Sequence, residues 1–186
     1  MRIIAGTARS RIIEAPPGRD TRPTLDRVRE NLFNMLQTGI RDTRVLDLFA
    51  GSGALSFEAI SRGASFAVLC DRDRNANRTE IGNAQKLNFT DQTRILFCDW
   101  TEAVRKLKAE QETFDLIFLD PPYMMTDMTD VMKQLEELLT EDGTVILEHE
   151  ARNAPTVPDS YECVRERSWG YCGVSMYKLK DGGGEA

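Results

Sequence analysis

Short apolar segments rich in β-branched residues alternate with helical segments through the middle of this chain. Strand-like segments occupy residues 44–49, 66–71, 93–97, 114–120 and 144–148, and helical patterns lie between them at 54–62, 74–87, 101–110 and 130–139. Strands that alternate with helices form βαβ units, in which a parallel sheet has helices on both faces. The alternation therefore predicts an α/β fold with a mostly parallel sheet.

Both ends of the chain depart from this alternation. Near the C-terminus, residues 161–169 and 174–179 flank a glycine-containing turn and predict an antiparallel hairpin at one edge of the sheet. Near the N-terminus, two β-branched runs flank Gly6 and predict a small hairpin within residues 1–20. A helix should follow, with Thr24 as its N-cap and Gly39 at its end. We assign residues 21–180 to the main domain and 181–186 to a flexible tail.

Length and composition indicate one folded domain. The chain has 186 residues, of which 41% are hydrophobic, so it can bury a core. No apolar run approaches the roughly 20 residues of a membrane span, and the start is too short for a signal peptide. The four cysteines lack the spacing of a metal site. We therefore expect a cytoplasmic protein, monomeric, without a metal and without a membrane partner.

The charge is unevenly distributed along the sequence. The net charge is −6, but residues 1–44 hold nine arginines and five acidic residues, so this segment carries +4 and the remainder −10. A basic segment on an acidic body suggests an anionic partner, although a solvated surface explains the pattern equally well.

A glycine turn follows the first central strand. Gly51 and Gly53 lie between the strand at 44–49 and the next helix, and Asp71 ends the second strand 20 residues after Gly51. A glycine turn with an acidic residue at this distance is typical of a nucleoside-binding site, in which the acid holds the ribose. The alternative is a tight turn with a solvated aspartate. Ser56 replaces the third glycine of the dinucleotide fingerprint, and S-adenosylmethionine, which has no phosphate, does not need that glycine.

The sequence Asp120-Pro121-Pro122-Tyr123 follows the fourth central strand. The Asp120 carboxylate and the Pro121 carbonyl could accept the N–H groups of an exocyclic amine, because proline removes donors and fixes the backbone. Tyr123 offers a face on which a flipped-out base can stack. The alternative is an extended surface loop. No cysteine lies nearby, which disfavours carbon methylation through a cysteine nucleophile, and His149 is more readily structural than catalytic.

These motifs resemble a known family. Asp47–Leu55 and Asp120–Tyr123 resemble S-adenosylmethionine-dependent amino-methyltransferases, and Arg22-Pro23-Thr24 with Asp26–Glu30 is similar to the bacterial 16S ribosomal RNA guanine-966 N2-methyltransferases. The resemblance implies a Rossmann-like, seven-stranded sheet with a reversed last strand. It also implies S-adenosylmethionine as cofactor and an N-terminal hairpin that contacts RNA.

The candidate site residues fall into three groups. The catalytic candidates are Asp120, Pro121, Pro122 and Tyr123. The cofactor candidates lie on the arginine-proline-threonine helix and at strand ends: Thr24, Arg27, Asp47, Phe49, Gly51, Gly53, Asp71, Arg72, Asp99 and Trp100. For Asp99, contact with adenine and capping of the helix at 101 are equally good explanations. The RNA candidates are Arg2, Arg9, Arg11 and Arg22.

The expected activity is methyl transfer to the N2 amine of a guanine in small-subunit ribosomal RNA, within a partly or fully assembled subunit. A DNA adenine-N6 methyltransferase would share the catalytic turn but usually carries an inserted recognition segment. A nicotinamide oxidoreductase would bind NAD and leave Pro121-Pro122 without a role. A non-catalytic RNA-binding assembly factor would not require Asp120.

Overall fold

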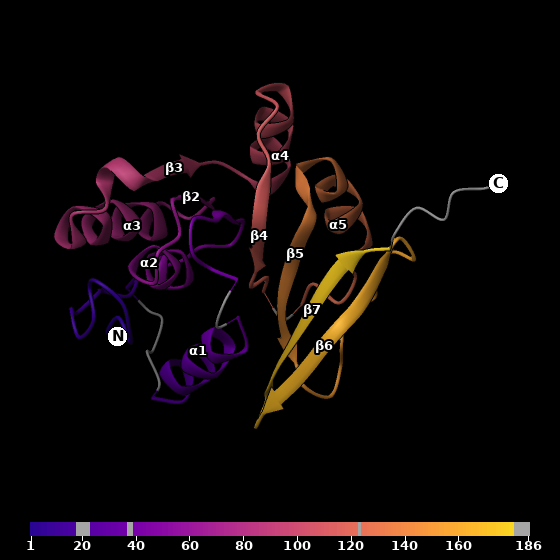
Figure 1. The fold of residues 1–186 in the computed structure, drawn as a ribbon, viewed down its shortest axis with the longest axis horizontal. Helices are drawn as coiled ribbons and strands as arrows, with labels where there is room; N and C mark the ends of the chain where they lie inside the picture. The colour runs from indigo at the N-terminus through magenta and orange to yellow at the C-terminus, as the bar shows by residue number, and fades with distance from the viewer. Residues whose placement is uncertain (18–22, 37–38, 123, 181–186) are drawn as a thin grey trace.

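The computed structural model describes residues 1–17, 23–36, 39–122 and 124–180 (Figure 1). Three sequence predictions therefore lie outside the described residues: Arg22, Tyr123 and the tail at 181–186. The side chains of residues 23–25 are also not described, which includes that of Thr24.

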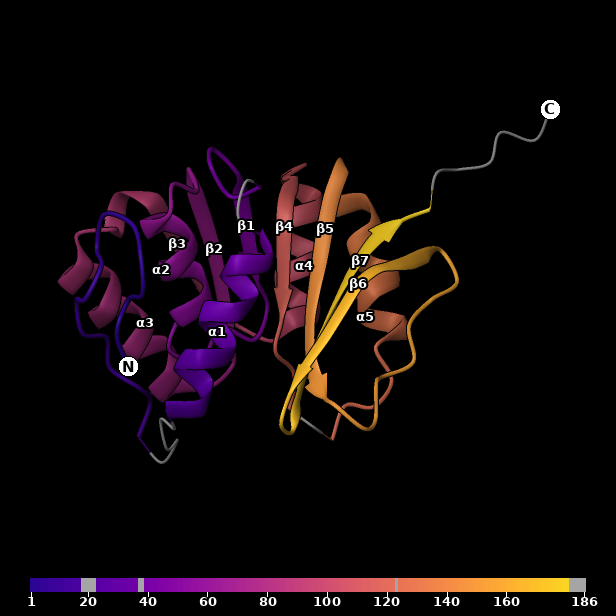
Figure 2. The ribbon, with the colours of Figure 1, turned by 60° about the horizontal axis from the view of Figure 1, so that its bottom comes forward.

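Seven strands form one sheet in the order β3-β2-β1-β4-β5-β7-β6. They are β1 (Arg44–Asp47), β2 (Phe66–Asp71), β3 (Thr93–Phe97), β4 (Phe114–Leu119), β5 (Leu139–Glu150), β6 (Tyr161–Trp169) and β7 (Cys172–Leu179). Strands β1 to β5 pair in parallel, whereas β7 runs antiparallel to both β5 and β6 (Figure 2). The predicted seven-stranded sheet with a reversed last strand is confirmed, and β7 lies between β5 and the edge strand β6.

Helices cover both faces of the sheet, as predicted (Figure 1). The helices α1 (Pro23–Leu36), α2 (Ala54–Ser61) and α3 (Arg74–Leu87) contribute to one apolar cluster, and α4 (Trp100–Ala109) and α5 (Thr129–Leu135) to the other. Two short 3-10 turns, Thr90–Gln92 and Glu136–Leu138, precede β3 and β5. Within the described ranges, no helix is long and apolar enough to cross a membrane.

Several element boundaries differ from the sequence prediction. Helix α1 begins at Pro23, so Thr24 lies inside its first turn and the prediction that it is the N-cap was wrong. Proline suits the first helical position because its missing N–H would be unpaired there. Strand β5 begins at Leu139 and spans 12 residues, although only 144–148 showed a strand pattern. Its first residues, Leu139–Gly143, are mostly polar and therefore lack an apolar signal.

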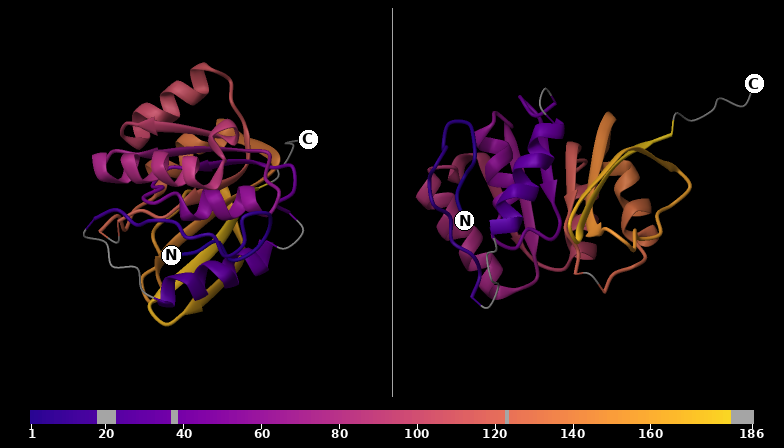
Figure 3. Two further views of the ribbon diagram at one scale, coloured as in Figure 1. Left: turned by 90° about the vertical axis from the view of Figure 1, so that its left-hand side faces the viewer. Right: turned by 90° about the horizontal axis from the view of Figure 1, so that it is seen from below.

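The N-terminal residues form a hairpin that packs on the body of the protein (Figure 3). Arg2 and Ile12 form an antiparallel bridge, and Ile3 and Ile13 are buried in the cluster shared with α1, α2 and α3. Gly6 has φ +82°, and a Cβ there would lie 1.7 Å from the Ser61 carbonyl oxygen of α2. Only glycine allows this close approach.

Glu58 of α2 holds the hairpin in place. Its carboxylate is fully buried and accepts the backbone N–H groups of Ile4 (2.8 Å) and Ala5 (3.1 Å). The Arg62 Nε donates to the same carboxylate at 2.7 Å. The buried Glu58 carboxylate therefore accepts hydrogen bonds from three donors. A side chain that could not accept them would leave buried N–H groups unpaired.

We predict that Glu58→Gln lowers the free energy of unfolding by about 2–4 kcal/mol, because the carboxamide sets an N–H₂ group against buried donors. Urea denaturation measures the loss, and trypsin should cut at Arg9 faster than in the wild type. Glu102→Gln, at an exposed position of α4, is the matched control. Equal stability of the two variants would contradict the assigned role of Glu58.

Candidate functional site

The turn between β1 and α2 is shaped by its two glycines. Gly51 has φ +58° and Gly53 has φ +75°, both in the left-handed region. A Cβ at Gly53 would lie 2.4 Å from the Phe57 ring, so the turn has no room for a side chain there. The Gly51 N–H donates to the Asp71 carboxylate at 2.9 Å, which ties the turn to the end of β2. The sequence thus placed Asp71 beside the glycine turn correctly.

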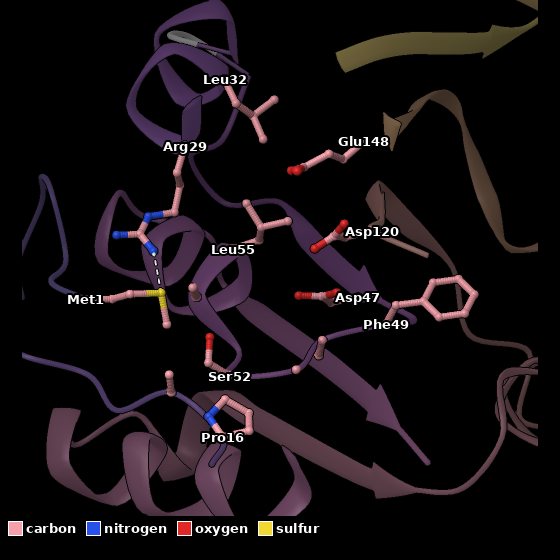
Figure 4. Close-up of a pocket in the computed structure, with 14 residues that line it drawn as sticks. Met1, Pro16, Arg29, Leu32, Asp47, Phe49, Ser52, Leu55, Asp120 and Glu148 are labelled. Atoms are coloured by element: carbon pink, nitrogen blue, oxygen red, sulfur yellow. Dashed lines mark hydrogen bonds between the residues drawn. The ribbon is translucent and has the colours of Figure 1, made fainter. Parts of the chain in front are cut away.

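A cavity of about 140 Å³ opens beside this turn (Figure 4). The residues that line it come from the N-terminal segment, α1, the glycine turn and the ends of three strands: Met1, Ala15, Pro16, Arg29, Leu32, Asp47, Phe49, Ala50, Gly51, Ser52, Ala54, Leu55, Asp120 and Glu148. Four of them, Asp47, Phe49, Gly51 and Asp120, are sequence candidates. The structure therefore brings the glycine turn and the Asp120 turn to one cavity.

Three carboxylates face this cavity from three adjacent strands. Asp47 ends β1, Asp120 follows β4, and Glu148 lies near the end of β5 (Figure 4). Asp47 pairs in register with Phe118, and Leu119 pairs with Leu147. Side chains alternate along a strand, so Asp47, Asp120 and Glu148 all lie on the same face of the sheet. The cavity is therefore acidic and favours a cationic ligand.

Asp47 is the most deeply buried of the three, with 1% of its surface exposed. Its Oδ2 accepts a hydrogen bond from Ser56 Oγ at 3.0 Å, whereas its Oδ1 has no hydrogen-bond partner among the described residues. Burial raises the pKa of Asp47 to about 7, and the nearby charge of Asp71 adds to the rise. A donor or cation bound in the cavity would satisfy Oδ1 and favour the ionised carboxylate.

The side of the cavity opposite the strands is built from the N-terminal segment and α1. Arg29, 5% exposed, donates to the Arg2 carbonyl and to Asp26 Oδ1 at 3.1 Å. Its Nη1 lies 3.8 Å from the Met1 sulfur (Figure 4). Arg29 therefore positions Met1 at the cavity wall. No local sequence pattern marks this role, because it depends on a tertiary contact with Met1.

Asn83 of α3 joins the N-terminal segment to the glycine turn. Its Nδ2 donates to the carbonyls of Ser52 (2.9 Å) and Glu14 (3.0 Å), and its Oδ1 accepts the Glu14 N–H at 2.8 Å. Glu14 directly precedes Ala15 and Pro16, which line the cavity. Asn83 is 1% exposed. The only feature of the sequence that could have indicated this role is a polar residue on the buried face of α3.

Glu80 lies one turn earlier on α3 and is fully buried. Both of its carboxylate oxygens lack a hydrogen-bond partner in the part of the chain that the structure describes. Burial raises the pKa of Glu80 to about 9, with further contributions from Asp71 and Asp47. At neutral pH this side chain is therefore a neutral acid in the folded protein.

Three other cofactor candidates lie after β2 and at the start of α4, and their contact with the cofactor stays a prediction. Asp99 is the N-cap of α4 and accepts the Thr101 N–H at 3.0 Å, which agrees with the capping interpretation. Arg72 is exposed, with its Nη1 4.0 Å from Asp99 Oδ2. Trp100 packs against the apolar cluster under α4 and α5. None of these three residues lines the cavity described above.

The structure places two of the predicted arginines outside the cavity. Arg27 lies away from the cavity, in a separate hollow with Arg2 and Arg9, so its placement does not support contact with the cofactor. Arg11 donates to the carbonyls of Leu87 (3.0 Å) and Lys86 at the C-terminal end of α3. These bonds give Arg11 a place at the end of α3, and its predicted contact with RNA stays a prediction. Arginine spacing in the sequence could not separate these roles.

The Asp120 turn borders a second, smaller hollow. Pro121 and Pro122 line it together with Glu148, His149 and other residues of the loops around β5. Glu148 thus borders both hollows, and burial raises its pKa. Both ring nitrogens of His149 have partners, because Nδ1 lies 2.9 Å from the Glu150 carbonyl oxygen and Nε2 lies 2.8 Å from Ser175 Oγ. His149 is therefore structural. Among the described residues, no group of three or more His, Cys, Asp or Glu could hold a metal ion.

The chain matches a family model over nearly its full length. The model, described as "Conserved hypothetical protein 95", matches residues 1–178. The chain belongs to this family.

Two curated relatives are similar across almost the whole chain. The ribosomal RNA small subunit methyltransferase D of Escherichia coli is 35% identical over 96% of this chain and 89% of its own length. YlbH of Bacillus subtilis, provisionally named an rRNA methyltransferase, is 35% identical over 97% of this chain and 100% of its own length.

Solved structures show the same fold. An Escherichia coli structure provisionally named methyltransferase yhhF superposes with a TM-score of 0.82 and 33% identity, over 97% of this chain and 98% of that one. A structure at 17% identity, named SMU.776 and complexed with SAH, has a TM-score of 0.72 over 86% of this chain and 50% of its own. At that identity the likeness concerns the fold alone.

We predict that Glu80→Gln stabilises the protein at pH 8 by about 1–3 kcal/mol. The unfolded chain releases the Glu80 proton near pH 4.5, whereas the folded protein keeps it to about pH 9. Wild-type stability should therefore fall as pH rises through this window, and the glutamine variant removes that loss. Urea denaturation at pH 5 and pH 8 measures it, with exposed Glu166→Gln as control. A pH-independent difference would argue against a neutral Glu80.

Proposed function

We propose that this protein transfers a methyl group from S-adenosylmethionine to the exocyclic N2 amine of a guanine in small-subunit ribosomal RNA. The observation that carries the proposal is the single acidic cavity shared by the glycine turn and the Asp120 turn. The names of the curated relatives support ribosomal RNA as the substrate.

The charges in the cavity suit the proposed cofactor. S-adenosylmethionine carries its methyl group on a cationic sulfur, and its amino-acid end carries an ammonium and a carboxylate group, so the molecule has a net positive charge. Asp47 Oδ1, buried at the cavity wall and without a partner among the described residues, can accept such a cation. Asp71, beside the glycine turn, is the candidate for the ribose hydroxyls. A nicotinamide dinucleotide would bring a pyrophosphate toward three carboxylates, which disfavours the oxidoreductase alternative.

Asp120 and Pro121 are the candidates to hold the reacting amine. The lone pair of an exocyclic amine is delocalised into the ring, and acceptors for both N–H bonds localise it on nitrogen. The Asp120 carboxylate can accept one N–H and the Pro121 carbonyl the other. Positioning then supplies much of the rate enhancement. As the nitrogen bonds to the methyl carbon, the carbon–sulfur bond would break and S-adenosylhomocysteine would leave. The nitrogen would then lose one proton, which Asp120 or water can take.

The N-terminal side offers a contact for the RNA. Arg2, Arg9 and Arg27 converge around one hollow, where they form a basic patch beside two acidic residues of α1. Phosphate contacts of this kind position a nucleic acid without reading its sequence. We propose that the substrate is a partly or fully assembled small subunit, and that the protein acts as a cytoplasmic monomer.

We predict methyl transfer from labelled S-adenosylmethionine to ribosomal RNA or to small subunits from a strain that lacks this protein, with N2-methylguanosine as the product. Nucleoside digestion followed by mass spectrometry identifies the product and maps its position. Asp120→Ala should lower kcat at least 100-fold, while exposed Asp159→Ala should not. N6-methyladenine formed in duplex DNA would support the adenine alternative instead. An Asp120→Ala variant with full activity would argue for a different catalytic turn.

We further predict that affinity for S-adenosylmethionine falls as pH drops through about 7. The ionised Asp47 carboxylate attracts the cation, and with a pKa near 7 its ionised fraction falls roughly tenfold between pH 8 and pH 6. Isothermal titration calorimetry at pH 6, 7 and 8 measures the change. Asp47→Asn should bind more weakly and show little pH dependence. The same pH slope in wild type and variant would exclude Asp47 as its source.

A further inference from the structure

Glu148 is the one carboxylate in the cavity that neither the sequence motifs nor the proposed cofactor contacts explain. We infer that Glu148 is a specificity-determining residue, which accepts the N1–H of the target guanine while Asp120 and Pro121 hold its N2 amine. This inference rests on the proposed function. It explains how the same site would distinguish guanine from other purines.

The position of Glu148 in the sheet supports this role. Leu119 of β4 pairs with Leu147 of β5, so Asp120 and Glu148, each one residue further along, are neighbours across adjacent strands. Adjacent strands lie about 4.8 Å apart. Two carboxylates at neighbouring positions of adjacent strands can therefore meet donors on two neighbouring atoms of one purine edge. Figure 4 shows both side chains pointing into the cavity from the same side.

The order of the strands separates the two ligands. The sheet runs β2-β1-β4-β5, so Asp47 and the glycine turn lie on one side of Asp120 and Glu148 on the other. Glu148 also borders the smaller hollow with Pro121 and Pro122, where Asp47 does not reach. A base held by Asp120 and Pro121 would therefore extend toward Glu148, away from the glycine turn.

The chemistry of the purines makes this arrangement selective. Guanine presents N1–H beside its N2 amine, and a carboxylate accepts from both. Adenine presents N1 as an acceptor beside its N6 amine, so a carboxylate at that place would face a lone pair. A site built to hydrogen-bond one group rejects an analogue that lacks it, because its own polar groups stay unpaired. The Asp120 motif by itself could hold the amine of either adenine or guanine. Glu148 would thus make the site selective for guanine.

2-Aminopurine tests the inference directly, because it keeps the 2-amino group of guanine but has an acceptor at N1. The RNA is prepared with guanine or 2-aminopurine at the methylated position, which the product analysis above maps, and is reconstituted into small subunits. The wild type should prefer guanine by about 100-fold or more in kcat/KM. In Glu148→Gln the carboxamide can donate to N1, so this preference should fall at least tenfold.

Two control variants and two further measurements keep the test decisive. Glu148→Asp retains a carboxylate and should retain part of the guanine preference, and exposed Glu162→Gln on β6 should retain all of it. The fluorescence of 2-aminopurine reports binding of the base without the cofactor, and Glu148→Gln should bind this RNA more tightly than the wild type does. Thermal unfolding verifies that each variant is folded.

The outcomes distinguish the inference from the proposed function. If the wild type methylates guanine and Glu148→Gln keeps the full preference over 2-aminopurine, the inference is wrong and the proposed function stands. Weaker binding of S-adenosylmethionine with unchanged base preference would overturn the inference too, by assigning Glu148 to the cofactor. If the wild type methylates no guanine in any acceptor, the proposed function fails, and the inference fails with it.

Discussion

The site depends on the parallel pairing of β1, β4 and β5, which brings three strand ends to one edge of the sheet. At this point the chain order of the strands reverses, since β1 lies between β2 and β4, and open α/β sheets bind ligands in the crevice at such a reversal. The register places Asp47, Asp120 and Glu148 on one face. Three carboxylates near one cavity repel one another, and burial adds to the cost of ionising them. A cationic ligand lowers both the repulsion between the carboxylates and the free-energy cost of ionising them. The acidic cavity and the proposed cofactor are therefore complementary.

The N-terminal segment is part of this site as well as a candidate contact for RNA. Glu58 and Ser61 of α2 hold the hairpin, while Arg29 of α1 and Asn83 of α3 place Met1 and the residues after Glu14 at the cavity wall. The same segment carries Arg2 and Arg9 on its exposed side. The cavity wall and the basic patch are therefore parts of one small structural unit.

Ser56 shows how one substitution in a common motif changes its chemistry. A dinucleotide-binding turn uses glycine at this place for close packing beneath a pyrophosphate. Here the serine hydroxyl donates to one oxygen of the Asp47 carboxylate, and the other oxygen is buried without a hydrogen-bond partner among the described residues. The serine that replaces the third glycine thus lies beside a cavity lined by carboxylates. An anionic cofactor would bind poorly there.

The sequence by itself determined the α/β class, the helices on both faces, the reversed last strand and the glycine and Asp120 turns, because hydrophobic periodicity and turn residues are local signals. It did not reveal Glu148, Arg29 or Asn83, whose roles depend on partners 27 or more residues away in the chain. It also did not show that Arg11, unlike Arg2 and Arg9, donates to carbonyls at the end of α3. Only the tertiary structure decides which polar side chains of similar local pattern become buried, paired or directed at the cavity, since burial and register are properties of the packed sheet.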